Sequence, residues 1–172
     1  MSQFDTSWAD MSARVIRVIL ARKGMGYAEL ATALESVGVE ENEKSLALRV
    51  MRGRVKFPML LQILHVTNSL APRAWLDAMS LDTSWEGRAM GVLEVERARH
   101  PAVSNDYLAQ RMVQLGSTLS EKTLASHLDQ GTVSLPEFLQ FIVALGSSSL
   151  DLYVDYDDLA AVARAAVAER SL

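Results

Sequence analysis

Apolar residues near the start of the chain recur three or four positions apart, at Trp8, Met11, Val15 and Val18. This spacing predicts a helix over about residues 8–22, with N-cap candidates at residues 5–7. A break that contains two glycines, at residues 23–26, separates it from a second predicted helix over about residues 27–37. No stretch shows the alternation of β-branched and polar residues that is typical of a strand. We therefore predict an all-α fold.

Glycine, asparagine and proline residues mark the ends of the next predicted helices. Gly38 is suited to the position after the second helix, because glycine tolerates a left-handed backbone conformation. Asn42 is a cap candidate for a third helix, which stops at Gly53. Pro58 fits the first turn of a fourth helix that continues to about Thr67.

The sequence contains an internal repeat. Asp5-Thr6-Ser7-Trp8 recurs as Asp82-Thr83-Ser84-Trp85, and the later matches lie 78 residues apart. The longest later match aligns Glu-Lys-Ser-Leu-Ala at 43–47 with Glu-Lys-Thr-Leu-Ala at 121–125. Other matched pairs are Leu30/Leu108, Gly38/Gly116, Gly53/Gly131, Pro58/Pro136 and Ser69/Ser147. A series of matches in the same order indicates a tandem duplication.

The second copy predicts the same four helices, at about residues 85–99, 105–115, 120–130 and 136–145. We expect one four-helix unit at residues 1–80, a second at 81–154 and a C-terminal helical segment at 155–172, with the two units joined near residues 70–82. The two units should superpose after a rotation. The matched pairs that should occupy equivalent core positions are Trp8/Trp85, Leu46/Leu124 and Leu61/Leu139.

Two segments lie outside the repeated helices. Trp75 and Tyr153 occupy matching positions after the two copies, and we expect each to anchor its segment onto the core of its own copy. Asp155, Asp157 and Asp158 open an alanine-rich helix that ends near Arg170, and acids at a helix start favour capping. A cation site is the alternative, although the spacing lacks the glycine and distal glutamate of an EF-hand loop.

The C-terminal helix has a narrow apolar stripe, formed by Leu159, Val162, Ala163, Ala166 and Val167. Such a stripe predicts either a cap on the core of the second copy or a seam between two chains.

Composition excludes several classes of protein. No apolar run approaches the ~20 residues that span a membrane, and the N-terminus lacks a signal-peptide pattern, so we expect a soluble cytoplasmic protein. The chain has no cysteine, and its three histidines lack metal-ligand spacing, so we expect no metal and no cofactor. No nucleophile elbow accompanies the Ser, His and Asp residues, and we expect no enzymatic activity.

Charge is distributed unevenly along the chain. The net charge of −4 combines about +2 over residues 1–80 with about −6 over residues 81–172. Residues 44–56 contain five basic side chains and no acid. This distribution predicts a local anion-binding patch in the first copy.

The second and third predicted helices of copy one carry Tyr-Ala-Glu-Leu-Ala-Thr-Ala-Leu at 27–34 and Ser-Leu-Ala-Leu-Arg-Val-Met-Arg-Gly at 45–53, with Gly38 between them. This segment resembles the lambda-repressor-like class of bacterial helix-turn-helix domains. The chain is also similar to a family of small uncharacterised bacterial domains, on the residues Arg52-Gly53, Phe57 and Leu61-Gln62. The resemblance covers about residues 8–69 and, more weakly, 85–147. It implies a helical fold and DNA binding through the third helix.

The acids Glu40, Glu41 and Glu43 depart from the helix-turn-helix pattern. They place negative charge near the start of the third helix, where a recognition helix normally presents residues to base edges. The candidate DNA-binding residues lie beyond them and are Lys44, Ser45, Leu48, Arg49, Arg52, Arg54 and Lys56. Arginine suits bidentate contacts to phosphate or guanine. The alternative is an ordinary solvated helix face.

The second copy is an internal control for this patch. At the five basic positions it carries Lys122, His127, Gln130, Thr132 and Ser134, so only the lysine remains. We therefore expect copy two to be a structural or partner-binding unit.

Leu48 and Met51 are apolar residues among the arginines. They suit a protein interface as well as a DNA groove, and burial against the other copy is a further alternative.

The sequence therefore predicts a DNA-binding transcriptional regulator that binds double-stranded DNA through the third helix of copy one. A homodimer formed through copy two and the C-terminal helix would supply a second half-site. The alternative is an adaptor that uses the same scaffold for contacts with a protein partner and does not bind DNA.

Overall fold

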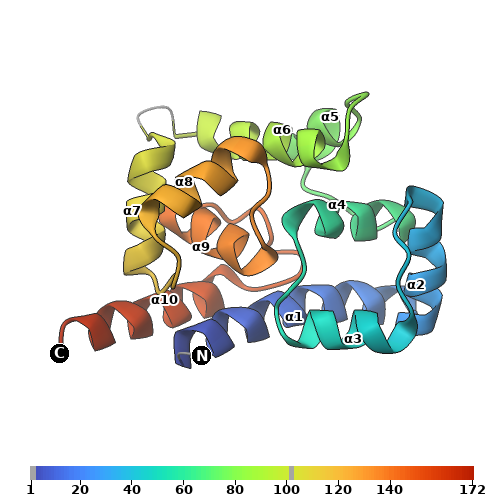
Figure 1. Cartoon of the computed structure of the whole chain (residues 1–172), viewed down its shortest axis with the longest axis horizontal. Helices are drawn as coiled ribbons and strands as arrows, with labels where there is room; N and C mark the ends of the chain where they lie inside the picture. Colours follow the sequence, from blue (N-terminus) through green and yellow to red (C-terminus); the bar gives the residue numbers. More distant parts are fainter. Residues whose placement is uncertain (1–2, 101–102) are drawn as a thin grey trace.

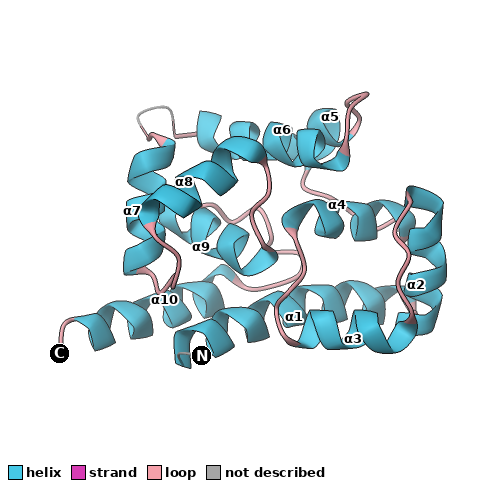
Figure 2. Cartoon of the chain, in the orientation of Figure 1, coloured by secondary structure: helices cyan, strands magenta, loops and turns pink. Residues whose placement is uncertain are grey.

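A computed structural model describes residues 3–100 and 103–172 of the chain (Figure 1). These residues form α-helices and two short 3-10 helices joined by loops, and they contain no strand (Figure 2). The predicted all-α fold is confirmed. No helix in this part of the chain is both long enough and apolar enough to cross a membrane.

Copy one forms α1 (Gln3–Lys23), α2 (Tyr27–Leu34), α3 (Glu43–Met51) and α4 (Phe57–Val66). A 3-10 turn, η1 (Glu35–Val37), extends α2 to Gly38, whose φ of 82° places it in the left-handed region that favours glycine. The predicted N-cap at residues 5–7 is wrong, because α1 begins at Gln3. No glycine or proline interrupts residues 3–7, so the helix continues through them.

Copy two forms α6 (Trp85–Ala98), α7 (Asn105–Gln114), α8 (Glu121–Gln130) and α9 (Leu135–Leu145), and α10 (Tyr156–Arg170) follows. The link between the copies holds two short elements that the hydrophobic pattern did not predict, η2 (Arg73–Trp75) and α5 (Leu76–Met79). They are too short for a helical period to show in the sequence.

The two copies exchange their outer helices, which are the first and fourth helices of each copy. Helix α1 of copy one packs on α9 of copy two, and α4 of copy one packs on α6 of copy two. These two pairings are equivalent, because the repeat aligns α1 with α6 and α4 with α9. The copies are therefore related as the two halves of an isologous dimer, within one chain.

Backbone hydrogen bonds at the centre of this arrangement show the same reciprocity. Phe57 N donates to the carbonyl of Val133 at 2.8 Å, and Leu135 N donates to the carbonyl of Val55 at 2.7 Å. They flank a single antiparallel bridge between Lys56 and Ser134, which are matched residues of the repeat. We call residues 55–57 and 133–135 the central bridge.

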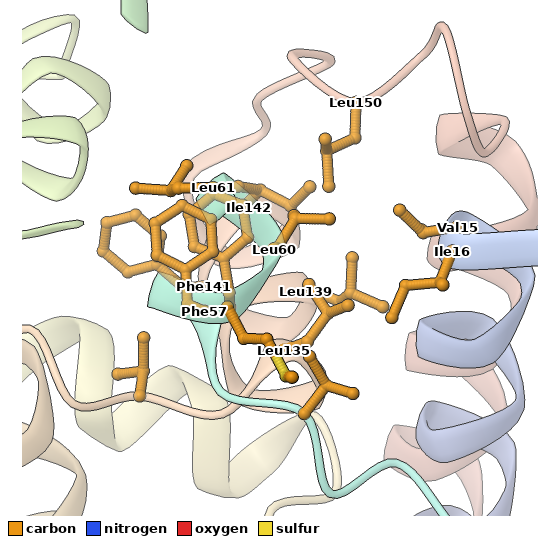
Figure 3. Close-up of a cluster of buried hydrophobic side chains, with 14 of the residues drawn as sticks. Val15, Ile16, Phe57, Leu60, Leu61, Leu135, Leu139, Phe141, Ile142 and Leu150 are labelled. Carbon is orange, nitrogen blue, oxygen red and sulfur yellow. The ribbon is translucent and has the colours of Figure 1, made fainter. Parts of the chain in front are cut away.

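One hydrophobic core lies around the central bridge. Buried residues of α1, α4 and α9 meet in it, together with Leu150 from the segment before α10 (Figure 3). The rings of Phe57 and Phe138 stack with centroids 3.8 Å apart, and Trp75 packs edge-on against both at 5.7 Å. Because both copies contribute to the same core, separating them would expose much of the apolar surface on which each depends.

The two aromatic anchors cross between the copies. Trp75 follows copy one, but its Nε1 donates a 2.7 Å hydrogen bond to the buried carboxylate of Glu96 on α6. Tyr153 follows copy two, and its hydroxyl donates to the carbonyl of Leu70 at the end of copy one. The expected anchor onto its own copy is found for Trp75, which packs on Phe57, and the exchange of outer helices also brings the opposite copy next to each linker.

Burial raises the pKa of the Tyr153 hydroxyl above its ordinary value near 10, while the charge of Arg22 and a hydrogen bond with Ser69 act in the opposite direction. The guanidinium of Arg22 lies 5.1 Å from the centroid of the Tyr153 ring, as a cation–π contact. Tyr153 therefore stays neutral and fixed against copy one at neutral pH.

Three matched pairs test the equivalence of the copies. Leu46/Leu124 and Leu61/Leu139 are fully buried in both copies, as expected. Trp8 and Trp85 differ, because Trp8 is buried and donates from Nε1 to the carbonyl of Leu115 at 2.9 Å, whereas Trp85 is only half-buried. Trp85 instead packs beside His65 and under the guanidinium of Arg88.

Helix α10 uses its apolar stripe within the chain. It packs on α9, α7 and α1, and it buries Leu159, Ala163 and Ala166. This confirms that α10 covers the core of copy two. The helix also reaches copy one, because Asp158 pairs with Arg14 of α1 at 2.8 Å. Asp155 occupies the N-cap position, but its side chain makes no capping hydrogen bond.

Gly53 allows α1 to approach the end of α3. Its φ is 66°, and a Cβ there would lie 2.6 Å from the Cβ of Ala9. Gly53→Ala should lower the free energy of unfolding by about 2–4 kcal/mol, because a left-handed backbone and an overpacked contact are combined. Gly24→Ala is the matched control, since Gly24 has φ 62° and open space around it, and should cost about 1–2 kcal/mol. Equal losses in urea unfolding would contradict the close approach.

Trp75 connects the linker to Glu96, and this contact gives a second prediction. Trp75→Phe removes one donor from a buried carboxylate, whose other oxygen accepts from Ser147 Oγ at 2.7 Å. We expect a loss of about 2–4 kcal/mol in the free energy of unfolding. Trp85→Phe, at a half-buried site, should cost less than about 1 kcal/mol. Chemical denaturation of both variants tests this, and a small effect at Trp75 would show that the link is dispensable.

Candidate nucleic-acid interface

Helix α3 is fixed by a cap and by two buried side chains. The Oδ1 atom of Asn42 accepts a hydrogen bond from Ser45 N at 2.8 Å, so the predicted N-cap is confirmed. Leu46 and Val50 are fully buried and hold one face of the helix against the core. The opposite face is left for solvent, and the loop after α3 leads to Lys56 at the central bridge.

The structure brings most of the predicted DNA-binding residues together. All seven are exposed. Six of them line one open concavity of about 410 Å³, and these are Ser45, Leu48, Arg49, Arg52, Arg54 and Lys56. Lys44 is exposed in the first turn of α3 but does not line it. We call these seven residues the basic surface.

Of the acids near the start of α3, Glu43 is exposed beside Lys44, and Glu41 is paired with the basic surface. Glu41 Oε1 lies 2.5 Å from Arg49 Nη2, and the Glu41 side chain is only 8% exposed. The sequence suggested that Glu41 would present negative charge at the start of α3. In the structure its carboxylate forms an ion pair with Arg49 instead. In the described part of the chain, Arg52, Arg54 and Lys56 form no ion pair, so these three cations remain free to bind a polyanion.

The two apolar residues of this region are exposed. Leu48 is 38% exposed and Met51 is 59% exposed. Burial of these residues against the other copy, one of the alternatives from the sequence, is therefore wrong. Copy two reaches this region at the central bridge residue Lys56 and leaves Leu48 and Met51 uncovered.

Copy two carries an acidic concavity beside the equivalent helix, and it shares two matched lining positions with the basic one, Ser126 and Gln130. It measures about 440 Å³ and involves the equivalent helix, α8. Its lining includes the acids Asp106, Glu121 and Asp129 and a single basic residue, Lys122. The same scaffold thus presents a basic concavity in copy one and an acidic concavity in copy two.

The counterpart of Arg49 in copy two is also engaged differently. His127 Nδ1 lies 3.0 Å from Glu137 Oε2, and Glu137 is buried at the start of α9. Glu137 takes the place of Met59 in copy one. The pair gives His127 an internal partner and directs it toward α9.

The described residues contain no group of three or more His, Cys, Asp or Glu side chains placed to hold a metal ion. Of the three acids at the start of α10, Asp158 is engaged with Arg14. The amide of Tyr156 donates to Asp151 Oδ1 at 3.2 Å. These contacts fix the start of α10 against the rest of the chain.

Sequence reasoning missed two features of this region. The Glu41–Arg49 pair joins residues eight positions apart across the start of α3, and no helical spacing predicts it. The position of Arg52 and Arg54 beside copy two was also missed, because it depends on the exchange of outer helices. The helical spacing of residues within α3 predicts which face of the helix is exposed, but it does not predict contacts with other segments.

Comparison with known proteins gives one match. A family model described as "Domain of unknown function (DUF6471)" matches residues 8–71 and again residues 85–150. Neither the curated proteins nor the solved structures gave a match. The two matched segments coincide with the two copies and cover most of the chain. The chain therefore belongs to the DUF6471 family, of which it contains two tandem domains.

Proposed function

We propose that the protein binds double-stranded DNA through the basic surface of copy one and acts as a transcriptional regulator. The observation that carries the proposal is the grouping of Arg49, Arg52, Arg54 and Lys56 around one concavity that no acid lines. Such a cluster can neutralise several phosphates and release their counterions. Its place on the third helix of a helix-turn-helix-like unit supports binding in or beside a groove.

Copy two has a supporting role in this proposal. Its acidic concavity would be repelled by phosphates, so the chain should approach DNA with copy one first. Lys56 belongs to the central bridge, which ties the basic surface to the shared core. This rigid attachment lowers the entropy that would be lost when the surface binds.

A homodimer remains part of the proposal. Two half-sites about 34 Å apart are usual for helix-turn-helix proteins, and the described residues of one chain present a single basic surface on a third helix. The apolar stripe of α10 is largely used within the chain, so a second chain would have to use other surfaces. One candidate contact is the exposed Val167 near the end of α10, with Leu172 beyond it.

An adaptor that binds a protein partner is the second candidate. The exposure of Leu48 and Met51 beside arginines favours it, because Met and Arg are enriched at protein interfaces relative to the rest of the surface. In that case the same face of α3 would bind an acidic partner that has an apolar centre.

A swap between the copies tests DNA binding. The variant replaces four cations by their copy-two counterparts, as Arg49→His, Arg52→Gln, Arg54→Thr and Lys56→Ser. We expect affinity for a short duplex to fall at least about tenfold near 0.1 M salt, and the slope of log K against log salt to decrease by about 3. Fluorescence anisotropy with a labelled duplex measures both quantities.

The matched control removes four exposed cations elsewhere, as Arg73→Gln, Arg99→Gln, Arg164→Gln and Arg170→Gln. It has the same net charge as the swap variant and should keep most of the affinity and the slope. Equal losses in the two variants would show that only total charge matters. No binding by the wild type at low salt would leave the adaptor as the favoured function.

A further inference from the structure

A second concave site lies between the two copies. Its volume is about 450 Å³, and it is lined by the start of α1 and the loop after α3 on one side, and by the α7–α8 loop and the start of α9 on the other. Clefts of this size at the junction of two units are common binding sites for small molecules. We call it the inter-copy cleft.

Buried polar side chains converge on the inter-copy cleft. Ser117, Glu137 and Gln140 each line it, and each is less than 9% exposed. The Oε1 atom of Gln140 is buried and has no hydrogen-bond partner in the described residues. Buried polar groups are normally satisfied, so an unpartnered amide beside a cleft points to a missing donor.

The charges of the cleft are separated between its two walls. Arg52 and Arg54 line the copy-one wall, and Glu137, whose Oε2 atom lies 3.0 Å from His127 Nδ1, lines the copy-two wall. A purely anionic ligand would be repelled by Glu137, and a purely cationic ligand would be repelled by the arginines. A small molecule with an anionic group at one end and an ammonium at the other satisfies both walls.

We propose that the inter-copy cleft binds a free amino acid. The ligand carboxylate pairs with Arg52 and Arg54, as guanidinium groups favour. The ligand ammonium donates to the Glu137 carboxylate, which His127 engages through Oε2, and to Gln140 Oε1, which has no partner among the described residues. Leu119 and Pro136 also line the cleft and offer apolar contacts for the ligand side chain.

The cleft and the basic surface share two residues. Arg52 and Arg54 line both concavities. A bound amino acid would occupy their guanidinium groups and so withdraw two cations from the DNA phosphates. This regulatory consequence rests on the proposed function, whereas ligand binding itself does not.

Isothermal titration calorimetry on the full chain, with each protein amino acid in turn and without DNA, tests the site. We expect at least one amino acid to bind, and Gln140→Leu and Arg54→Gln to weaken it by about tenfold or more. Gln62→Leu is the matched control, because Gln62 is the copy-one counterpart of Gln140 and does not line the cleft. It should leave binding unchanged, with circular dichroism confirming that all three variants are folded.

The N-acetylated amino acid and inorganic phosphate complete the test. Both should bind at least about tenfold more weakly than the free amino acid, because they lack the ammonium. Equal binding of either probe would contradict recognition of a zwitterion. Binding that Gln140→Leu and Arg54→Gln leave intact would contradict it as well. Absence of binding by every amino acid would overturn the site.

Addition of the bound amino acid to the protein–DNA complex then tests regulation separately. The slope of log K against log salt should decrease by about 2, since two phosphate contacts are lost. An unchanged slope despite calorimetric binding would overturn the coupling while leaving the site. A protein that binds the amino acid but no DNA would overturn the proposed function alone.

Discussion

Two reciprocal backbone hydrogen bonds, from Phe57 N to Val133 O and from Leu135 N to Val55 O, hold the two copies in a fixed relation. The outer helices α1, α4, α6 and α9 pack across the two copies around this bridge. The shared core that results makes the stability of each copy depend on the other. The position of the basic surface and the existence of the inter-copy cleft both follow from the same bridge.

The duplication provides two equivalent scaffolds, and their surfaces have diverged. Leu46 and Leu124 are buried at equivalent positions in α3 and α8, while the exposed residues beside them differ in charge. Arg52 of copy one corresponds to Gln130 of copy two, and Met51 corresponds to Asp129. Core positions determine the fold, and exposed positions can change charge at little cost in stability. One copy can therefore bind a polyanion while the other supports it.

Much of the fold could be predicted from periodicity and from residues that begin or end helices. Asn42, Gly38 and Pro58 lie at or near helix ends as expected, because caps and left-handed positions depend on local chemistry. The exposed face of α3 was predicted for the same reason. The crossing of Trp75 to Glu96 could not be predicted, because a repeat shows that two segments fold alike and does not show which helices they exchange. The Glu41–Arg49 pair and the inter-copy cleft likewise depend on contacts between residues with no fixed spacing.

The central claim is that the basic surface binds DNA by neutralising phosphates. The most direct measurement is the affinity of the unmodified protein for a short DNA duplex across a range of salt concentrations. Five cations belong to the basic surface and one is paired with Glu41, so we expect log K to fall with log salt with a slope of about −3 to −4. A slope near zero, or no binding at low salt, would contradict the account.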